Sequence, residues 1–204
     1  MDTRDDPRLA TSHEIALSHS LRNNKLGLSM YWDNLFVDQN LTLLESVTEI
    51  GRTGIISEII SRNASPGVVL DVGCGTGILS SMIDIVSFTY LGCDISTVAI
   101  NFAIQHRARD NVSFVTSTFQ DLGHIDSVSA IVFNESLYYL DVEEALTNAS
   151  KLLSPSGLLI ISIFDFPEGR LLLDSLRDRL SLIVNTSVSN LTTGFRWDVV
   201  AGHL

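Results

Sequence analysis

Residues 68–77 read Val-Val-Leu-Asp-Val-Gly-Cys-Gly-Thr-Gly, and the fold is inferred outward from this stretch. Its first half, residues 68–72, is short, apolar and rich in β-branched side chains, which predicts a buried strand. Glycines follow at positions 73, 75 and 77, and an apolar pattern over residues 78–83 then predicts a helix. Glycine allows a sharp turn and lets a ligand approach the backbone without meeting a Cβ atom. A strand, a Gly-rich turn and a helix in this order predict a ligand site at the turn.

Alternating strand and helix patterns continue toward the carboxyl end of the chain. Apolar runs predict strands at residues 88–94, 112–115, 127–133, 158–163, 183–191 and 195–201. Helical spacing lies between them, with Ser96 and Asp141 as N-caps of two helices and Pro167 opening a third that reaches Leu182. Residues 152–157 are expected to form a helix end and a turn. This alternation predicts an α/β fold, a parallel sheet with helices on both faces, in which the last two strands form an antiparallel hairpin.

The region before residue 68 has a different character. Apolar residues three and four apart predict a helix over residues 42–60, ended by Asn63, Pro66 and Gly67. Residues 1–25 are polar and predict a mobile arm with one short helix near 12–21. The aromatic stretch at residues 30–36, which contains Tyr31 and Trp32, is too apolar to stay in water and is expected to pack against the fold.

Composition sets limits on the class of protein. The 204 residues include 13 Lys and Arg against 24 Asp and Glu, giving a net charge of −11. This acidic balance predicts no nucleic-acid partner and no association with anionic membranes. Only two cysteines occur, and no His or Cys spacing is typical of a metal site, so no metal is expected. The acidic start of the chain lacks an apolar leader, which predicts a cytoplasmic protein.

Two carboxylates indicate which ligand the Gly-rich turn binds. A dinucleotide fingerprint needs a third glycine where this chain has Ile78, and Asp71 at the start of the turn would repel a pyrophosphate. Asp71 suits an ammonium group instead. Asp94, at the end of the next strand, can accept hydrogen bonds from the hydroxyls of a ribose. An ammonium and a ribose together describe S-adenosylmethionine (SAM) better than NAD.

With these residues in place, the chain resembles a class I SAM-dependent methyltransferase over about residues 30–204. The resemblance implies a Rossmann-like, doubly wound seven-stranded sheet in the order 3-2-1-4-5-7-6 with strand 7 antiparallel. It also implies that SAM is the cofactor, with Asp94 at its ribose, Ile95 and Phe119 at its adenine, and Thr118 where the family often has an acidic residue. The implied cofactor-binding residues are Asp71, Gly73, Cys74, Gly75, Gly77, Asp94, Ile95, Ser96, Thr118, Phe119 and Asn134.

Acceptor and catalytic residues are expected from the stretch that follows the strand at 127–133. By analogy with the family, Asn134 would contact the methyl donor and Glu135 would contact the acceptor or act as a base, with Tyr138 as a second catalytic candidate. The structural alternatives are a carboxylate at a helix N-terminus and a core tyrosine. Tyr31, Trp32 and Tyr139 are expected to bind a small-molecule acceptor. Within the family, the chain looks most like small-molecule methyltransferases of the nodulation N-methyltransferase kind.

The expected organisation is therefore an N-terminal arm and lid or cap segment, residues 1–41, followed by a SAM-binding methyltransferase domain, residues 42–204. The predicted reaction is in-line transfer of a methyl group from SAM to a nitrogen or oxygen atom of a small molecule. Two alternatives stay open: a SAM-binding regulatory or scaffold protein without turnover, and a nicotinamide-dependent oxidoreductase. The sequence leaves the oligomeric state and the identity of the acceptor open.

Overall fold

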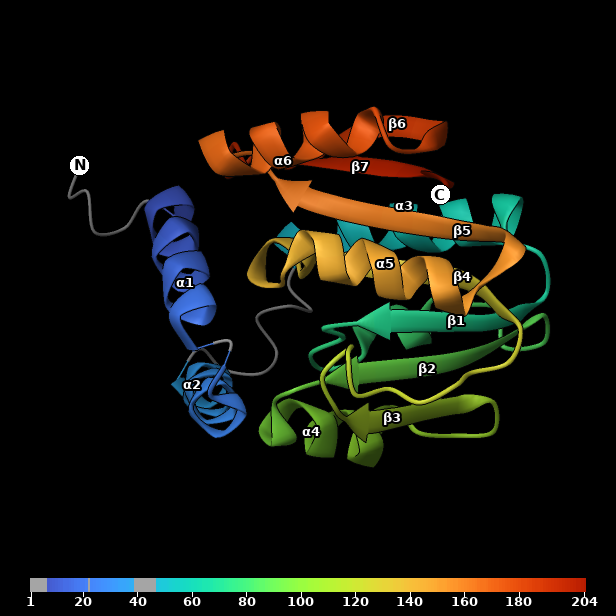
Figure 1. Cartoon of the computed structure of the whole chain (residues 1–204), viewed down its shortest axis with the longest axis horizontal. Coiled ribbons are helices and arrows are strands. Elements are labelled where there is room, and N and C mark those ends of the chain that lie inside the picture. Colours follow the sequence, from blue (N-terminus) through green and yellow to red (C-terminus); the bar gives the residue numbers. More distant parts are fainter. Residues whose placement is uncertain (1–6, 22, 39–46) are drawn as a thin grey trace.

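Seven strands form one sheet in the order β3-β2-β1-β4-β5-β7-β6 (Figure 1). The computed structural model describes residues 7–21, 23–38 and 47–204 of the chain. The strands are β1 (Gly67–Val72), β2 (Phe88–Asp94), β3 (Val112–Thr116), β4 (Val128–Asn134), β5 (Leu153–Phe164), β6 (Ser181–Ser189) and β7 (Arg196–His203). The strands from β1 to β5 pair in parallel, and β7 pairs antiparallel with both β5 and β6. The predicted fold class and sheet order are confirmed.

Within the described ranges, two helices precede the sheet domain, four cover it, and two short 3-10 helices lie in loops. They are α1 (Pro7–Leu21), α2 (Lys25–Asp38), α3 (Val47–Asn63), η3 (Ile78–Ser81), α4 (Thr97–Arg107), η4 (Leu137–Tyr139), α5 (Val142–Leu152) and α6 (Pro167–Arg177). Ser96 caps α4 by accepting from Ala99 N at 3.1 Å, and Asp141 caps α5 by accepting from Glu144 N at 3.1 Å, as predicted.

Alternate residues of the central strands supply two hydrophobic layers. Along β4, Ile131 and Phe133 join one cluster with α5 and α6, while Ala130 and Val132 join another with α3. Figure 1 accordingly shows α5 in front of the sheet and α3 behind it. Central strands that are buried on both faces need continuous apolar runs rather than alternating ones, which is the pattern found in the sequence.

The predicted helix after the Gly-rich turn is wrong in extent, because only the short 3-10 helix η3 forms there. Fifteen residues separate the end of β1 from the start of β2. The loop between β1 and β2 is held by side chains from other parts of the protein. Ser57 Oγ of α3 donates to the Met82 carbonyl at 2.7 Å, and Arg109 donates to the Ser80 carbonyl at 2.8 Å.

Three other boundaries differ from the sequence prediction. Residues 153–157 belong to β5 rather than to a turn, but the register passes from Val128–Leu153 to Ala130–Leu158, so residues 154–157 bulge out of the ladder. Helix α6 ends at Arg177 and β6 begins at Ser181, because the edge strand extends to pair with His203 of β7. The predicted helix at 42–60 corresponds to α3, and residues 42–46 lie outside the described residues.

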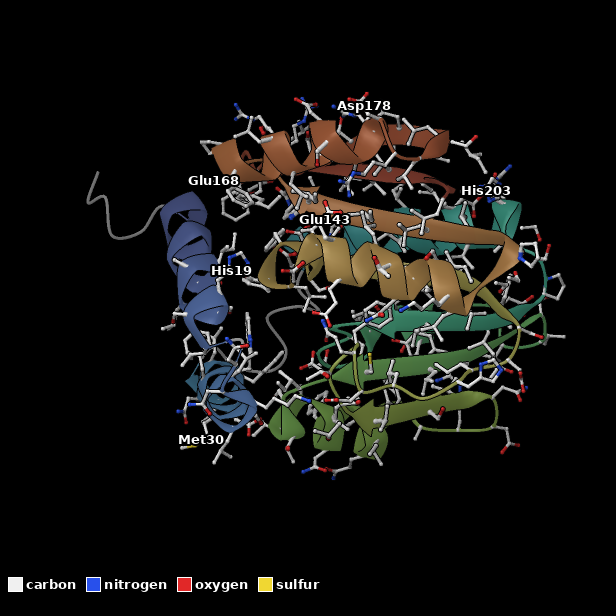
Figure 2. The ribbon with its side chains drawn as sticks, in the orientation of Figure 1. His19, Met30, Glu143, Glu168, Asp178 and His203 are labelled. Atoms are coloured by element: carbon white, nitrogen blue, oxygen red, sulfur yellow. The ribbon has the colours of Figure 1, made fainter. Side chains whose placement is uncertain are left out.

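The two N-terminal helices lie off the carboxyl ends of the parallel strands (Figure 1). The sequence predicted only one short helix before residue 25 and no helix over 25–38. The outer face of α2 carries the largely exposed Leu26, Met30 and Val37 (Met30 is labelled in Figure 2), and its inner face carries Trp32 and Leu35. Among the described helices, none is long and apolar enough to cross a membrane.

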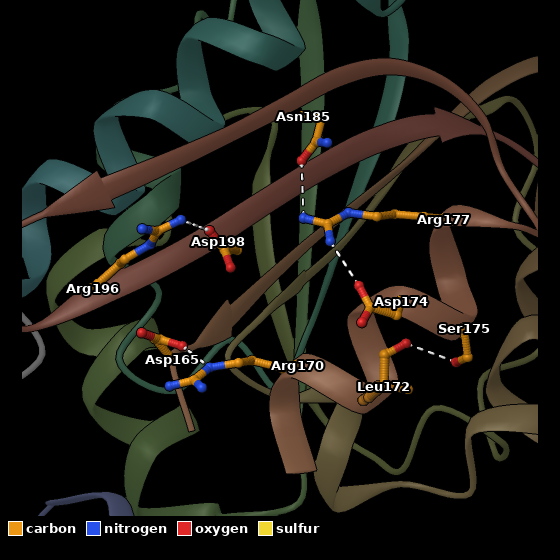
Figure 3. Close-up of polar contacts among 9 residues, drawn as sticks. All are labelled: Asp165, Arg170, Leu172, Asp174, Ser175, Arg177, Asn185, Arg196 and Asp198. Atoms are coloured by element: carbon orange, nitrogen blue, oxygen red, sulfur yellow. Dashed lines mark hydrogen bonds and ion pairs between the residues drawn. The ribbon is translucent and has the colours of Figure 1, made fainter. Parts of the chain in front are cut away.

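Polar contacts hold α6 in place at the β6 edge of the sheet (Figure 3). Arg177 donates to Asp174 at 2.8 Å and to Asn185 of β6 at 3.2 Å, which ties the helix to the edge hairpin. Arg170 pairs with Asp165 at 2.5 Å. Surface pairs of this kind contribute only about 0–1 kcal/mol each to stability. We therefore interpret these contacts around α6 as structural and not as part of a functional site.

Candidate functional site

A cavity of about 540 Å³ opens at the carboxyl ends of β1, β2 and β4, beneath α2 and η4. That volume lies within the range of small-molecule sites. In open α/β sheets, ligands bind at this end, where the strand order reverses. Here the order reverses between β1 and β4, which carry Asp71 and Asn134. Both side chains line the cavity.

The Gly-rich turn is pinned to the end of β2. Gly73 N and Cys74 N both donate to the Cys93 carbonyl oxygen, at 2.8 and 3.0 Å. Gly73 and Gly75 have φ of 70° and 52°, in the left-handed region, and both line the cavity. A Cβ atom on Gly73 would lie 2.6 Å from Ser136 Cβ, so a larger residue does not fit. Gly77 does not line the cavity; it precedes η3 and faces Phe114 and Ala103.

Asp71 brings a buried, partly unsatisfied carboxylate to the cavity. The Tyr90 hydroxyl donates to its Oδ2 at 2.6 Å, while Oδ1 is buried without a hydrogen-bond partner in the structure. Burial raises the pKa of Asp71 to about 7; the Tyr90 hydrogen bond opposes this shift and the nearby Asp94 adds to it. An orphaned carboxylate oxygen of this kind fits a ligand that carries an ammonium group.

Asp94 ends β2 on the same cavity wall. Its Oδ2 accepts from Gly75 N at 2.9 Å and its Oδ1 accepts from Ser96 N at 2.8 Å. Burial raises its pKa, and these backbone donors work against the shift. Each carboxylate oxygen keeps a second lone pair, so two ribose hydroxyls can still donate to this side chain.

The four residues expected near the adenine or beside the ribose fall into two groups. Ile95, Thr118 and Phe119 line the cavity, although Phe119 is also core, edge-on to Phe133 with ring centroids 5.5 Å apart. The Thr118 hydroxyl donates to Asp121 at 2.6 Å. Ser96 does not line the cavity: its hydroxyl caps α4 and donates to Asp33 of α2 at 2.7 Å.

The expected acceptor residues cluster where α1 and α2 meet η4. Trp32 and Tyr139 line the cavity and meet edge-on, with ring centroids 4.8 Å apart. The Tyr139 hydroxyl donates to Glu14 Oε2 of α1 at 3.0 Å, and His19 Nε2 donates to the Tyr138 carbonyl at 3.0 Å; Figure 2 labels His19 on α1. Tyr31 does not line the cavity; it packs edge-on against Trp32 at 5.4 Å.

The two catalytic candidates, Glu135 and Tyr138, both line the cavity but are engaged with the protein. The Tyr138 hydroxyl donates to Glu135 Oε2 at 2.9 Å, and Phe164 N donates to the same oxygen at 3.0 Å. Glu135 has φ of 63°, a strained conformation for a residue other than glycine. Burial raises the pKa of Tyr138 well above its ordinary value.

Arg52 of α3 was missed by the sequence reasoning. It is 4% exposed, lines the cavity, pairs with Glu49 at 2.6 Å and lies over the Trp197 ring at 5.0 Å. Its Nε donates to Asn134 Oδ1 at 2.8 Å.

The sequence did contain a signal for Arg52. It precedes the buried Ile56 by four residues, so it is a charged residue on the buried face of α3. Ile50 and Ile55, which are among the apolar residues that predicted this helix, are each 38% exposed instead.

Cys74 lines the cavity but is not set up as a nucleophile. It is buried, and burial raises the pKa of its thiol well above the ordinary value. Among the described residues, no group of three or more His, Cys, Asp or Glu side chains gathers in a way that could hold a metal ion.

Comparison with known proteins agrees with this geometry. Residues 70–161 match the methyltransferase domain family. A ubiquinone biosynthesis O-methyltransferase of Rickettsia bellii is 26% identical over 130 residues, which cover 61% of this chain and 54% of that protein. Its counterpart in Rhizobium leguminosarum bv. trifolii is 32% identical over 98 residues, 46% of this chain and 39% of that protein. The chain thus spans about half the length of the curated relatives it matches.

Solved structures share the fold. The N-methyltransferase NodS from Bradyrhizobium japonicum, in complex with S-adenosylhomocysteine (SAH), superimposes with a TM-score of 0.64 at 18% identity, covering 77% of this chain and 87% of that one. Magnesium protoporphyrin IX methyltransferase from Synechocystis, with bound SAH, gives 0.63 at 15% identity, covering 87% and 97%.

The sheet order, the Gly-rich turn and the matched domain define a nucleotide-binding methyltransferase fold. Residues 70–161 are similar to the methyltransferase domain family, and the chain resembles relatives and solved structures that are named as methyltransferases of small molecules. SAM is the methyl donor of this family, and the cavity fits it: Asp71 offers an unpartnered carboxylate oxygen for an ammonium, and Arg52 offers a cation for a carboxylate.

Proposed function

We propose that this protein transfers a methyl group from SAM to a nitrogen or oxygen atom of a small molecule. The observation that carries the proposal is one cavity that joins Asp71 and Asp94 at one end to Trp32 and Tyr139 at the other. The first end suits a charged nucleoside and the second end suits a small organic acceptor. Curated relatives named as O-methyltransferases and a structural neighbour named as an N-methyltransferase support both atom types.

In this proposal, Arg52 would hold the carboxylate of SAM. Its Nε and one Nη already donate to Asn134 and Glu49, which leaves three of its five N–H donors. Glu49 and the Trp197 ring fix the guanidinium in one orientation, so little side-chain entropy remains to be lost on binding. Asp71 would take the ammonium, Asp94 the ribose hydroxyls, and Ile95 and Phe119 the adenine.

The acceptor end of the cavity is aromatic and acidic. Glu14, Asp141 and Glu144 line it, against Lys25, which pairs with Asp121 at 2.5 Å. Excess carboxylates attract a cationic or neutral molecule more than a polyanion. Trp32 and Tyr139 supply large contact area for a small planar or aliphatic group.

SAM, when bound, supplies a methyl group on a positively charged sulfur that is already a good leaving group. The protein therefore has mainly to position the acceptor and exclude water. Trp32 and Leu35 of α2 would close the cavity above the donor, and the fixed ring of Tyr139 would orient the acceptor. Leu28 and Phe36 from the same helix add to the apolar roof.

Calorimetry with SAM, SAH and NAD(H), followed by assays with phenolic and amine acceptors, tests this function. We expect SAM and SAH to bind and NAD(H) not to bind. Asp94→Ala should weaken SAH binding about 10- to 100-fold, because a charged acceptor of hydrogen bonds is lost. Asp126→Ala, at a largely exposed aspartate in the loop before β4, is the matched control and should bind SAH normally.

Each alternative predicts a different result. Tight binding of NAD(H) would favour the hypothesis of a nicotinamide-dependent oxidoreductase. SAH binding without turnover on any acceptor would favour a regulatory or scaffold protein. Unchanged SAH affinity in Asp94→Ala would remove the ribose assignment.

A further inference from the structure

A short chain of hydrogen bonds links the ends of β4 and β5 behind the proposed methyl-donor site. The Ser162 hydroxyl of β5 is fully buried. It lies 2.9 Å from Asn134 Oδ1 and 3.0 Å from Glu135 Oε1. A serine hydroxyl has one proton, so it can donate to only one of these two oxygens.

The orientation of the Asn134 amide is fixed by its other neighbour. Arg52 Nε, which can only donate, lies 2.8 Å from Asn134 Oδ1. Exchanging the amide oxygen and nitrogen would bring two donors face to face, so the oxygen must point toward Arg52. Toward Ser162, Asn134 Oδ1 can therefore act only as an acceptor.

If Glu135 is ionised, the series of hydrogen bonds from Glu135 through Ser162 to Asn134 lacks one proton. A carboxylate is an acceptor only, and so is Asn134 Oδ1. Whichever of them Ser162 donates to, the remaining oxygen–oxygen contact, at 2.9 or 3.0 Å, has no hydrogen in it. A buried contact between two acceptors is costly, because neither lone pair is satisfied.

We propose that Glu135 is protonated in the resting protein and acts as a neutral positioning residue. Its Oε1–H donates to Ser162 Oγ, and the Ser162 hydroxyl donates onward to Asn134 Oδ1. Its carbonyl-like Oε2 accepts from the Tyr138 hydroxyl and from Phe164 N, at 2.9 and 3.0 Å. Each of the three oxygen–oxygen contacts of Glu135 and Ser162 then contains one proton. The proposal rests on the methyltransferase function and takes the role of general base away from Glu135.

The charges around Glu135 are compatible with a neutral acid. Burial raises the pKa of Glu135, and Glu49 of α3 raises it further. Arg52 of α3 and the hydrogen bonds from Tyr138 and Ser162 lower it. Tyr139 of η4 also lies near Glu135, and its hydroxyl donates to Glu14 of α1. His19 of α1 contacts the Tyr138 carbonyl at 3.0 Å. Arg52 pairs with Glu49 at 2.6 Å and donates to Asn134 at 2.8 Å rather than to Glu135.

The consequence is that Glu135 fixes three other groups that line the cavity. Through Ser162, it fixes the Asn134 amide, and through Asn134 it fixes Arg52. Through its other oxygen, it fixes Tyr138 of η4. The strained backbone of Glu135, with φ of 63°, is held by these contacts, and strain of this kind is typical of residues that position a site.

Glu135→Gln tests the proposal, because a glutamine amide reproduces the hydrogen-bond pattern of the protonated acid. Its Nε2 would donate to Ser162, and its Oε1 would accept from Tyr138 and Phe164 N. We expect SAH affinity and methyl transfer to stay within about fivefold of the wild type, whereas Glu135→Ala should lose at least about tenfold in SAH affinity. Glu58→Gln, at an exposed glutamate of α3, is the matched control.

The pH dependence of stability gives a second readout that needs no acceptor. Unfolded Glu135 releases its proton near its ordinary pKa of 4.5, while the native protein would keep it. The wild type should therefore lose stability relative to Glu135→Gln as pH rises above about 4.5. An infrared carboxylic-acid band at neutral pH, absent in Glu135→Gln, should accompany this.

A wild type that gains stability relative to Glu135→Gln over the same pH range would overturn the proposal, because it indicates an ionised native carboxylate. So would a loss of methyl transfer of about 100-fold or more in Glu135→Gln with SAH binding intact, as expected for a missing base. If no acceptor is ever methylated, the proposed function fails. The stability and infrared readouts still decide the protonation state of Glu135.

Discussion

At the scale of single residues, Asp71 is a carboxylate whose ionisation should respond to the ligand. Its pKa is raised to about 7, mainly by burial, and its Oδ1 has no hydrogen-bond partner in the structure. The ammonium group of SAM or SAH would stabilise the ionised form of this side chain. Ligand binding should therefore displace a proton from the protein at pH values below 7.

The first prediction follows for SAH affinity. Between pH 6 and pH 8 the ionised fraction of Asp71 rises about tenfold, so SAH affinity should rise by about the same factor. Asp71→Asn should bind SAH more weakly at pH 8 and without this pH dependence. Calorimetry in two buffers of different ionisation enthalpy measures both affinity and proton release. Asp84→Asn, at an exposed aspartate whose pKa is lowered, is the control.

The same shift has a defined sign for stability. Native Asp71 keeps its proton up to about pH 7, whereas the unfolded chain releases it near 3.8. The free energy of unfolding should therefore fall as pH rises through this window, and Asp71→Asn should remove that part of the slope. A wild type with the same pH profile as Asp71→Asn, in binding and in stability, would show that Asp71 is already ionised below neutral pH.

At the scale of elements, α2 is attached to α4 by one carboxylate. Asp33 Oδ1 accepts from the Ser96 hydroxyl at 2.7 Å and from Val98 N at 3.0 Å, so a residue of α2 completes the N-terminal cap of α4. Ser29 Oγ of the same helix donates to the Ile95 carbonyl at 3.1 Å. These contacts set the position of Trp32, one residue before Asp33, over the cavity.

Asp33→Ala is the second prediction. The variant loses two hydrogen bonds at a helix N-terminus, so we expect it to lose about 1–2 kcal/mol of stability. Hydrogen exchange should become faster in α2, and methyl transfer should fall more than SAH affinity, because the acceptor roof loosens. Asn34→Ala, at an exposed position of the same helix, controls for helix propensity. Exchange in α2 as slow as in the wild type would mean that the Asp33 contacts do not anchor the helix.

At the scale of the whole molecule, α1 and α2 lie over the end of the sheet where the cavity opens (Figure 1). Five side chains of α2 line the cavity, namely Lys25, Leu28, Trp32, Leu35 and Phe36, and Glu14 and Ser18 of α1 join them. We propose that residues 1–41 act as the lid or cap segment of a SAM-binding domain spanning residues 42–204. Lids of this kind exclude water and complete a site around the acceptor.

The third prediction concerns this segment. Deleting residues 1–36 should leave SAH affinity within about fivefold and should reduce methyl transfer at least about 100-fold, because acceptor and water exclusion are lost together. Limited proteolysis of α1 and α2 should slow when SAH and an acceptor are both present. Equal cleavage in the presence and absence of ligands, together with full activity of the truncated protein, would mean that the segment packs against the domain but does not act as a lid.

Local sequence patterns determined the framework. The apolar runs marked the strands, Ser96 and Asp141 marked two helix starts, and the Gly-rich turn with Asp71 and Asp94 marked the cavity end of β1 and β2. These features depend on neighbours within a few positions, so hydrophobic periodicity and turn chemistry suffice to locate them. The order of the strands in the sheet came from the family resemblance and agrees with the structure.

Only the tertiary structure decided the features that depend on residues far apart in the chain. Arg52 enters the cavity because α3 packs behind β4 and Trp197 holds its guanidinium, 145 positions away in sequence. The extent of β6 is set by its pairing with β7, and η3 stays short because the loop is anchored by Ser57 and Arg109. Glu135 looked like a base on a loop, but β5 encloses its carboxylate with Ser162 and Phe164 N. A hydrogen-bond partner supplied by another strand leaves no mark on the local pattern, which is why the chemistry of this site emerged only from the fold.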